Sequence, residues 1–171
     1  MSATGWADLL KVQRRICLRV AAAYCTTSRE AVSVITGIPP LYLLAKERRQ
    51  QHEKKKNEQT QPQENILDTW QTEWDNCKNG RWTHALIPRI GPWINRRHGE
   101  TNFHLTQALS GHGCFAADLK RFGKLDSPEC WFCDDPNDDA EHTIFRCDAF
   151  NGRSREAETE LETDLNPDSL I

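Results

Sequence analysis

The chain has 171 residues, of which 37% are hydrophobic and 27% charged, and its mean hydropathy of -0.72 is polar for a compact domain. The net charge of -3 conceals an asymmetry, because residues 11–56 hold 11 Lys/Arg against 3 Asp/Glu, residues 81–124 hold 7 against 2, and residues 125–171 hold 3 against 14. No stretch approaches the roughly 20 apolar residues of a membrane span, and the start lacks a secretory signal, so we expect an intracellular protein with no membrane partner.

Two helices at the N-terminus are predicted from apolar residues that recur at intervals of three and four. The first runs from Trp6, and Ser28 then caps a second helix that ends at Gly37, just before two prolines. Together they predict a helical hairpin. The buried side of the first helix is expected to consist of Leu9, Leu10, Ile16, Cys17, Val20 and Tyr24.

The middle of the chain is predicted to be helical with one polar interruption. A helix that begins near Leu41 loses its apolar periodicity in the basic run 46–56, which either projects into solvent or contacts nucleic acid. Residues 57–64 have the composition of a linker, and an amphipathic helix follows from Ile66. Glycines and prolines then divide residues 81–125 into short helices. The core of this part is expected to consist of Phe103, Leu105, Leu109, Phe115, Leu119 and Phe122.

The fold class that these elements predict is mainly α: a helical hairpin and short helices followed by a small zinc knuckle of the CCHC type. We expect five parts along the chain. They are the helical segment 1–56, the polar linker and amphipathic helix 57–80, the basic Trp-rich helical segment 81–125, the CCHC zinc knuckle 126–150 and the acidic tail 151–171.

The most specific signal is the spacing C-x2-C-x8-H-x4-C, formed by Cys130, Cys133, His142 and Cys147. Three thiolates and one imidazole are a ligand set that suits a closed tetrahedral zinc ion. Cysteines of an intracellular chain are expected to be reduced, which favours metal over disulfides. We therefore predict one structural zinc ion that contributes about 10 kcal/mol to folding.

Alternatives for these residues remain open. A redox Cys-x-x-Cys pair would need a βαβ pattern that is not apparent here, and four unliganded residues at chance spacing are a second alternative. His112 or Cys114 could replace a ligand, although a tight turn with a core cysteine is the favoured interpretation. Residues 132–135 match the Phe-x-Asp-Asp string of polymerase sites, but Cys133 is already assigned to the metal.

Basic and aromatic residues alternate in the segment 81–124, as a surface that tracks a nucleic-acid backbone with stacking rings requires. An ordinary cationic surface over a Trp-rich core explains the pattern equally well. The acidic loop between the second and third ligands would repel phosphate, so Trp131, Phe132 and Phe145 are expected to pack against neighbouring helices. The predicted nucleic-acid-binding residues are Arg81, Arg89, Arg96, Arg97, Lys120, Arg121 and Lys124.

A series of short motifs resembles a known family. The motifs are AAAYCTTSREA at 21–31, GIPP at 37–40, GRWT at 80–83, LIP at 86–88, LTQ at 105–107 and GHGCF at 111–115, followed by the cysteine cluster with Glu141 before its histidine. In this order they resemble the C-terminal end of the reverse transcriptase polyprotein of type-1 non-LTR retrotransposable elements of arthropods. The resemblance extends from about Trp6 to Arg153.

The resemblance implies a parent protein with an endonuclease, a reverse transcriptase and this tail, which copies its RNA at a nicked chromosomal site. It implies that residues 6–45 follow the polymerase thumb and that the cysteine cluster is the family's C-terminal knuckle. We expect no enzyme activity in this segment, and we expect RNA or DNA and the reverse transcriptase core as partners in the nucleus. A protein-interaction module and a truncated transposon remnant without function are the alternatives.

Overall fold

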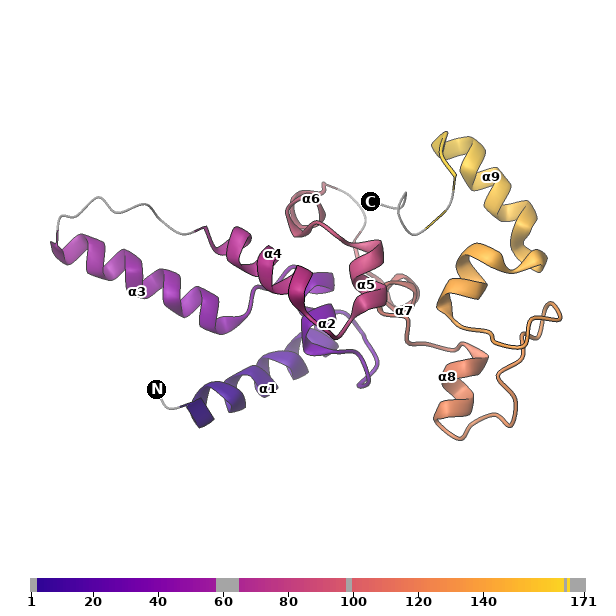
Figure 1. Ribbon diagram of the computed structural model, residues 1–171, viewed down its shortest axis with the longest axis horizontal. Coiled ribbons are helices and arrows are strands. Elements are labelled where there is room, and N and C mark those ends of the chain that lie inside the picture. Colours follow the sequence, from indigo (N-terminus) through magenta and orange to yellow (C-terminus); the bar gives the residue numbers. More distant parts are fainter. Residues whose placement is uncertain (1–2, 58–64, 98–99, 165, 167–171) are drawn as a thin grey trace.

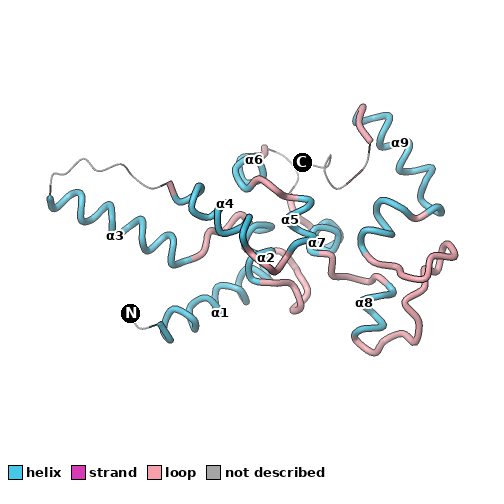
Figure 2. The backbone as a smooth tube through the Cα atoms, in the orientation of Figure 1, coloured by secondary structure: helices cyan, strands magenta, loops and turns pink. Residues whose placement is uncertain are grey.

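The computed structural model describes the whole chain except residues 1–2, 58–64, 98–99, 165 and 167–171. Its described residues form helices joined by turns and loops and contain no strand (Figure 2). The predicted fold class, mainly α, is confirmed. None of the helices in the described part of the chain has the length and apolar character that a membrane span requires.

The predicted N-terminal hairpin consists of α1 (Ala3–Val20) and α2 (Arg29–Thr36), which pack against each other. The Ser28 side chain accepts a hydrogen bond from the amide of Ala31 at 3.1 Å and so satisfies one free amide of the first turn. At the other end, Gly37 has a φ of 67°, and its amide bonds carbonyls of the last turn. Both predicted ends of α2 are therefore confirmed.

The side of α1 that faces the core differs from the prediction. Gln13, Cys17 and Ala21 are buried there, whereas four apolar residues are exposed. Three of them, Leu9, Ile16 and Val20, were predicted to be buried, so the prediction is wrong for these residues. The fourth exposed residue is Val12, which the prediction did not include.

A polar residue on the buried side explains this orientation. The Gln13 amide donates to the carbonyl oxygen of Pro39 at 2.7 Å, and its oxygen accepts from the amide of Leu41 at 3.0 Å. Because both ends of the amide are hydrogen-bonded, its burial costs little. Gln13 therefore joins α1 to the start of α3 (Leu41–Asn57).

Leu43 in the first turn of α3 is buried, and α3 packs against α1 and α4, whereas its C-terminal half extends away from the other helices, as the sequence predicted (Figure 1). The predicted linker 57–64 lies almost entirely outside the described residues. The next helix, α4 (Ile66–Asn76), is the predicted amphipathic helix, and its Trp70 and Trp74 are buried.

Four short helices follow, namely α5 (Arg81–Leu86), α6 (Ile90–Asn95), α7 (Phe103–Ser110) and α8 (Ala116–Arg121). Two tryptophans connect them to the earlier helices, because the Trp74 indole donates to the Ile87 carbonyl at 2.9 Å and the Trp93 indole to the Ile35 carbonyl at 3.3 Å. These bonds join α2, α4, α5 and α6 in one core, to which Cys17 of α1, Leu43 of α3 and Leu109 of α7 also belong. Phe103, a predicted core residue, is 44% exposed, so that prediction is wrong.

Candidate metal centre

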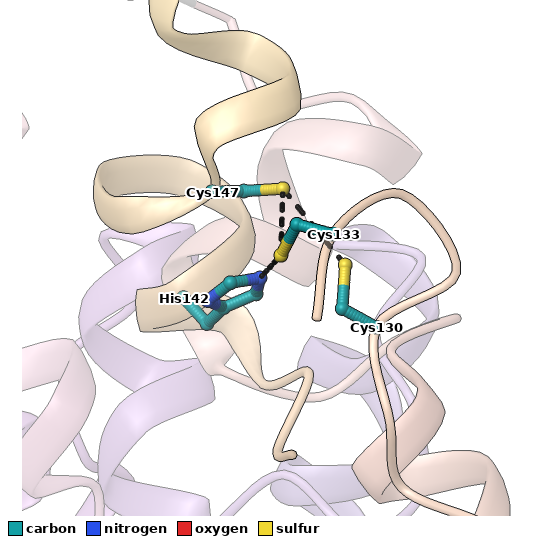
Figure 3. A group of neighbouring side chains, drawn as sticks. All are labelled: Cys130, Cys133, His142 and Cys147. Carbon is teal, nitrogen blue, oxygen red and sulfur yellow. Dashed lines mark hydrogen bonds between the residues drawn. The ribbon is translucent and has the colours of Figure 1, made fainter. Parts of the chain in front are cut away.

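Four side chains converge after α8, as Figure 3 shows. The Cys147 Sγ lies 3.8 Å from the Sγ of Cys130 and 3.8 Å from the Sγ of Cys133, and the Cys133 Sγ lies 3.4 Å from Nε2 of His142. All four donor atoms lie within 4.8 Å of one another. The cluster predicted from the spacing is thus assembled as a CCHC-like knuckle that could bind one metal ion.

Local backbone hydrogen bonds bring the ligands together. The amide of Cys130 donates to the carbonyl of Asp135 at 3.0 Å, which closes the turn that carries the first two cysteines. The other two ligands lie at the ends of a single π-helical turn, η1 (His142–Arg146): His142 is its first residue, and Cys147, which directly follows it, donates its amide to the carbonyl of His142 at 2.8 Å. This wider turn directs the imidazole and the last sulfur toward the same point.

The sulfurs do not ionise alike. Burial opposes ionisation of Cys130, but the Phe132 amide, the His142 side chain and the neighbouring Cys133 outweigh it and lower the pKa of Cys130 to about 7. Burial and the two nearby sulfurs raise the pKa of Cys147 to about 11. A cation among the sulfurs would favour every thiolate, so metal binding here would release protons.

The imidazole of His142 is 4% exposed, and only its Nε2 faces the sulfurs. Its other nitrogen, Nδ1, lies 3.4 Å from a carboxylate oxygen of Asp135 but makes no well-aligned hydrogen bond. Metal-bound histidines usually direct the second ring nitrogen to a carboxylate in this way. The buried nitrogen with an acid beside it therefore fits a ligand histidine.

Asp138 is a structural residue that the sequence did not reveal. It is buried, and its carboxylate accepts hydrogen bonds from the amide of Ala116 at 3.0 Å and from the hydroxyl of Thr143 at 2.5 Å. Its own amide donates to the carbonyl of Pro128 at 2.7 Å. Asp138 thus joins the loop between the ligands to the first turn of α8. Sequence alone does not distinguish it from Asp134, an exposed acid of the same loop.

The aromatic residues of the knuckle divide into two kinds. Phe145 packs against Trp82 with 6.1 Å between ring centroids, which confirms the expectation of packing on a helix. Trp131 and Phe132 are 63% and 61% exposed, so for them the expectation is wrong. Cys114, the predicted core cysteine, is also exposed, and its Sγ lies 3.4 Å from the hydroxyl of Tyr24 instead of joining the cluster.

The predicted nucleic-acid-binding residues lie on two groups of helices that are apart in Figure 1. One group belongs to α5, α6 and the adjoining loops, and the other to α8 and its C-terminal end. Arg96 differs from the rest, because its guanidinium lies 3.5 Å from the centroid of the buried Trp93 ring. The exposed members are Arg81, Arg89, Arg97, Lys120, Arg121 and Lys124.

The tryptophans of this segment are structural. Trp93 is buried, and the indole of Trp82 donates to the carbonyl of Ala108 at 2.7 Å while its ring meets Phe145. These two rings therefore do not form the stacking surface that was one interpretation of the basic and aromatic pattern. Phe103 is the exposed aromatic residue in the described part of the segment.

Comparison with known proteins identifies relatives of one kind. The chain is 28% identical over 163 residues to a 115 kDa protein in the type-1 retrotransposable element R1DM of Drosophila melanogaster, with 81% of this chain and 16% of the relative covered. It is 26% and 24% identical to two retrovirus-related Pol polyproteins from type-1 R1 elements of Nasonia vitripennis, covering 86% and 81% of this chain and 43% and 40% of the relatives. The chain thus spans less than half the length of these relatives.

No protein-family model and no solved structure matches the chain significantly. The three relatives nevertheless agree in kind, and each alignment covers more than four fifths of the chain. The resemblance drawn from the short motifs is therefore confirmed, and the chain is related over most of its length to the Pol polyproteins of type-1 R1 retrotransposable elements.

Proposed function

We propose that the chain is a non-catalytic, zinc-stabilised and nucleic-acid-binding segment of a retrotransposon RNA-directed DNA polymerase, located at its C-terminal end. It supports target-primed reverse transcription, and polymerisation and target cleavage belong to the remainder of the parent protein. The small share of each relative that the chain spans supports this division. The reverse transcriptase core is then its partner in the same polypeptide, and the nucleus is its place of action.

Zinc is the metal that best fits the cluster. At a Zn–S distance of about 2.3 Å and a tetrahedral angle, two coordinating sulfurs are separated by about 3.8 Å. Cys147 lies 3.8 Å from each of the other two cysteine sulfurs. Since four protein ligands leave no coordination position for water or substrate, the proposed ion is structural and not catalytic.

The surface charge of the segment 81–124 carries the proposal of nucleic-acid binding. Six of its cations are exposed, while Asp118 is buried and ion-paired with Arg121 at 2.6 Å. Glu100 is therefore the single exposed acidic residue in the part of the segment that the structure describes. Such an excess of exposed cations favours the phosphate backbone, whose neutralisation releases counterions.

The test is binding of the zinc-loaded chain to single-stranded RNA, single-stranded DNA and duplex DNA at several salt concentrations. With about four phosphate contacts, the logarithm of affinity should fall with log salt at a slope of roughly -3 to -4. The double variant Arg89→Ala with Arg97→Ala should weaken binding and make this slope less steep by about 1 to 2 units. These two residues suit the test because both are exposed.

A matched control has the same loss of charge elsewhere. Arg153→Ala with Arg155→Ala removes two exposed arginines from α9 (Asn151–Leu161) and should leave affinity nearly unchanged, because phosphate does not approach the glutamates of this helix. Equal weakening by both double variants would show that net charge alone determines binding. Absence of binding, or binding that does not respond to salt, would reject the proposed function.

A protein-interaction module is the second candidate, and exposed apolar residues support it. Ile16 and Val20 on α1 and Trp131 and Phe132 at the knuckle are all more than half exposed. Such a module would dock on the polymerase core through the N-terminal hairpin and offer its acidic tail to a basic partner. Deleting residues 148–171 therefore separates the candidates, because loss of a protein partner with intact nucleic-acid binding favours this second function. Intact or stronger nucleic-acid binding, with no protein partner affected, favours the first.

A further inference from the structure

An exposed apolar stripe runs along α1. Val12, Ile16 and Val20 are 52%, 53% and 60% exposed, and a spacing of four places them on one side of the helix. Leu9 extends the stripe by one turn. Contiguous exposed apolar side chains of this kind mark surfaces that bind a partner.

Cations border this stripe. Lys11, Arg15 and Arg19 are also spaced by four, so they form a second exposed row beside the apolar one. Lys11 is ion-paired with Asp8 at 3.1 Å, and both side chains are exposed. We call the apolar row with its three cations the α1 face. Its chemistry suits a partner that offers apolar and acidic side chains together.

The knuckle carries a second apolar surface of opposite charge. Trp131 and Phe132 are exposed, and Phe132 packs on the half-buried Phe150 with 5.3 Å between ring centroids. Exposed carboxylates flank the three rings in the sequence. These acids are Asp126, Glu129, Asp134 and Asp148. We call the three rings with these acids the knuckle patch. Phosphate would be repelled here, so the patch suits a basic protein surface.

The two surfaces lie in different parts of the molecule. In Figure 1, α1 is on the left and packs against α2 and α3, whereas the knuckle and α9 are on the right. They therefore do not cover each other within one copy of the chain. Between two copies, apolar residues would meet apolar residues and the cations of one would meet the acids of the other.

We propose that the α1 face of one copy docks on the knuckle patch of a second copy, in a head-to-tail contact. The contact is heterologous, so it produces a closed ring or a growing chain of copies and not a simple two-fold dimer. This inference rests on the protein-interaction function, and it does not depend on nucleic-acid binding. Since the two surfaces are small, the association should be weak and sensitive to salt.

Analytical ultracentrifugation of the zinc-loaded full chain over a wide concentration range tests the contact. Wild type should associate as concentration rises. Ile16→Glu should weaken association by about 30-fold or more, the effect of losing a central contact. The double variant Trp131→Ser with Phe132→Ser should have the same effect. Leu161→Glu is the matched control, because it charges an exposed leucine on α9 outside both surfaces and should not alter association.

Mixing the two defective proteins gives the decisive result. Ile16→Glu retains the knuckle patch, and the double aromatic variant retains the α1 face, so an equimolar mixture should form a one-to-one complex although each protein alone stays monomeric. A mixture that remains monomeric overturns the proposal. A wild-type chain that stays monomeric also overturns the proposal, and the α1 face would then bind another part of the parent protein. Association that needs only Ile16 would show a symmetric α1 contact, and this also overturns it.

One zinc ion per chain and an unchanged circular dichroism spectrum would show that the aromatic variant is folded. If it fails to fold, a second pair of variants still tests the proposal. Arg15→Glu and Asp134→Arg each reverse one exposed charge and should each weaken association. Their equimolar mixture should again associate, because each retains one intact surface. Unchanged association in both charge variants overturns the proposal.

Discussion

Replacing one cluster ligand should unfold the knuckle and leave the helical core intact. We expect Cys147→Ser to abolish zinc binding, because Cys147 is buried and lies 3.8 Å from two other sulfurs of the cluster. Few other groups stabilise this region. Apart from two cysteines of the cluster, Ala140 is the only buried apolar residue between positions 127 and 150, all of which the structure describes. Metal binding contributes on the order of 10 kcal/mol to comparable units, so its loss exceeds what the local core provides.

Hydrogen exchange measures the loss of stability in Cys147→Ser at individual backbone amides. The amides of Cys130 and Cys147 form the hydrogen bonds that close the two ligand turns, and the amide of Thr143 donates to the carbonyl of Asp139 in the turn that leads to His142. If only about 5 kcal/mol of the metal's contribution is lost, exchange at these amides should accelerate about 4,000-fold, at roughly 1.4 kcal/mol per factor of ten. The amides of Val32 and Ile38, which belong to α2 and its C-terminal cap, should keep their protection.

Cys114→Ser is the matched control, because it changes an exposed cysteine outside the cluster and should alter stability by less than about 0.5 kcal/mol. Zinc content measured by mass spectrometry should fall from one ion per chain to near zero in Cys147→Ser and in Cys130→Ser. Unchanged zinc content and unchanged melting in both ligand variants would refute the metal centre. Loss of protection throughout α2 as well would show that the knuckle and the core fold as one unit.

Three further substitutions test the surroundings of the cluster. Asp135→Asn should lower zinc affinity about 10- to 100-fold in competition with a chelator, because it removes the charge 3.4 Å from His142 Nδ1, and equal affinity would contradict this role. Asp138→Ala should lower the free energy of unfolding by about 2–4 kcal/mol in urea titrations, since it leaves the Ala116 amide and the Thr143 hydroxyl unpaired; an effect below about 0.5 kcal/mol would show that they find other partners. Gly111→Ala should destabilise the chain by about 1–3 kcal/mol, because its φ is +67° and its new Cβ would lie 2.7 Å from Trp82. Gly123→Ala is its control, with a φ of +66° and no neighbour within 4 Å, so equal melting temperatures of the two variants would eliminate the Trp82 contact as a cause.

Features determined by neighbouring residues were predictable from the sequence. Ser28 and Gly37 mark the ends of α2 because a cap acts on amides and carbonyls only a few residues away. The cysteine cluster was predictable for a similar reason. Cys130 and Cys133 belong to one turn, and a single turn of helix separates His142 from Cys147, so the spacing itself contains most of the geometry.

Features determined by distant contacts were not predictable. Periodicity showed that α1 is amphipathic, but it did not show that Gln13 would find two backbone partners after residue 38 and turn Ile16 toward solvent. The exposure of Trp131 likewise depends on which parts of the fold reach the knuckle. Asp138 owes its burial to the amide of Ala116, 22 residues earlier in the chain, and no local pattern contains that information.

Under the proposed function, a metal ion in the cluster influences nucleic-acid binding without touching nucleic acid. Phe145 of the knuckle packs on Trp82 of α5, and Asp138 holds the first turn of α8, so the knuckle connects the two groups of exposed cations. Without the metal these contacts lose their support, and the cations near Arg89 and those near Lys120 are no longer held at a fixed separation. Chelation should therefore weaken binding to long strands, which need both groups, more than binding to short oligonucleotides, which need one. Equal weakening for both lengths would mean that the separation of the two groups does not matter.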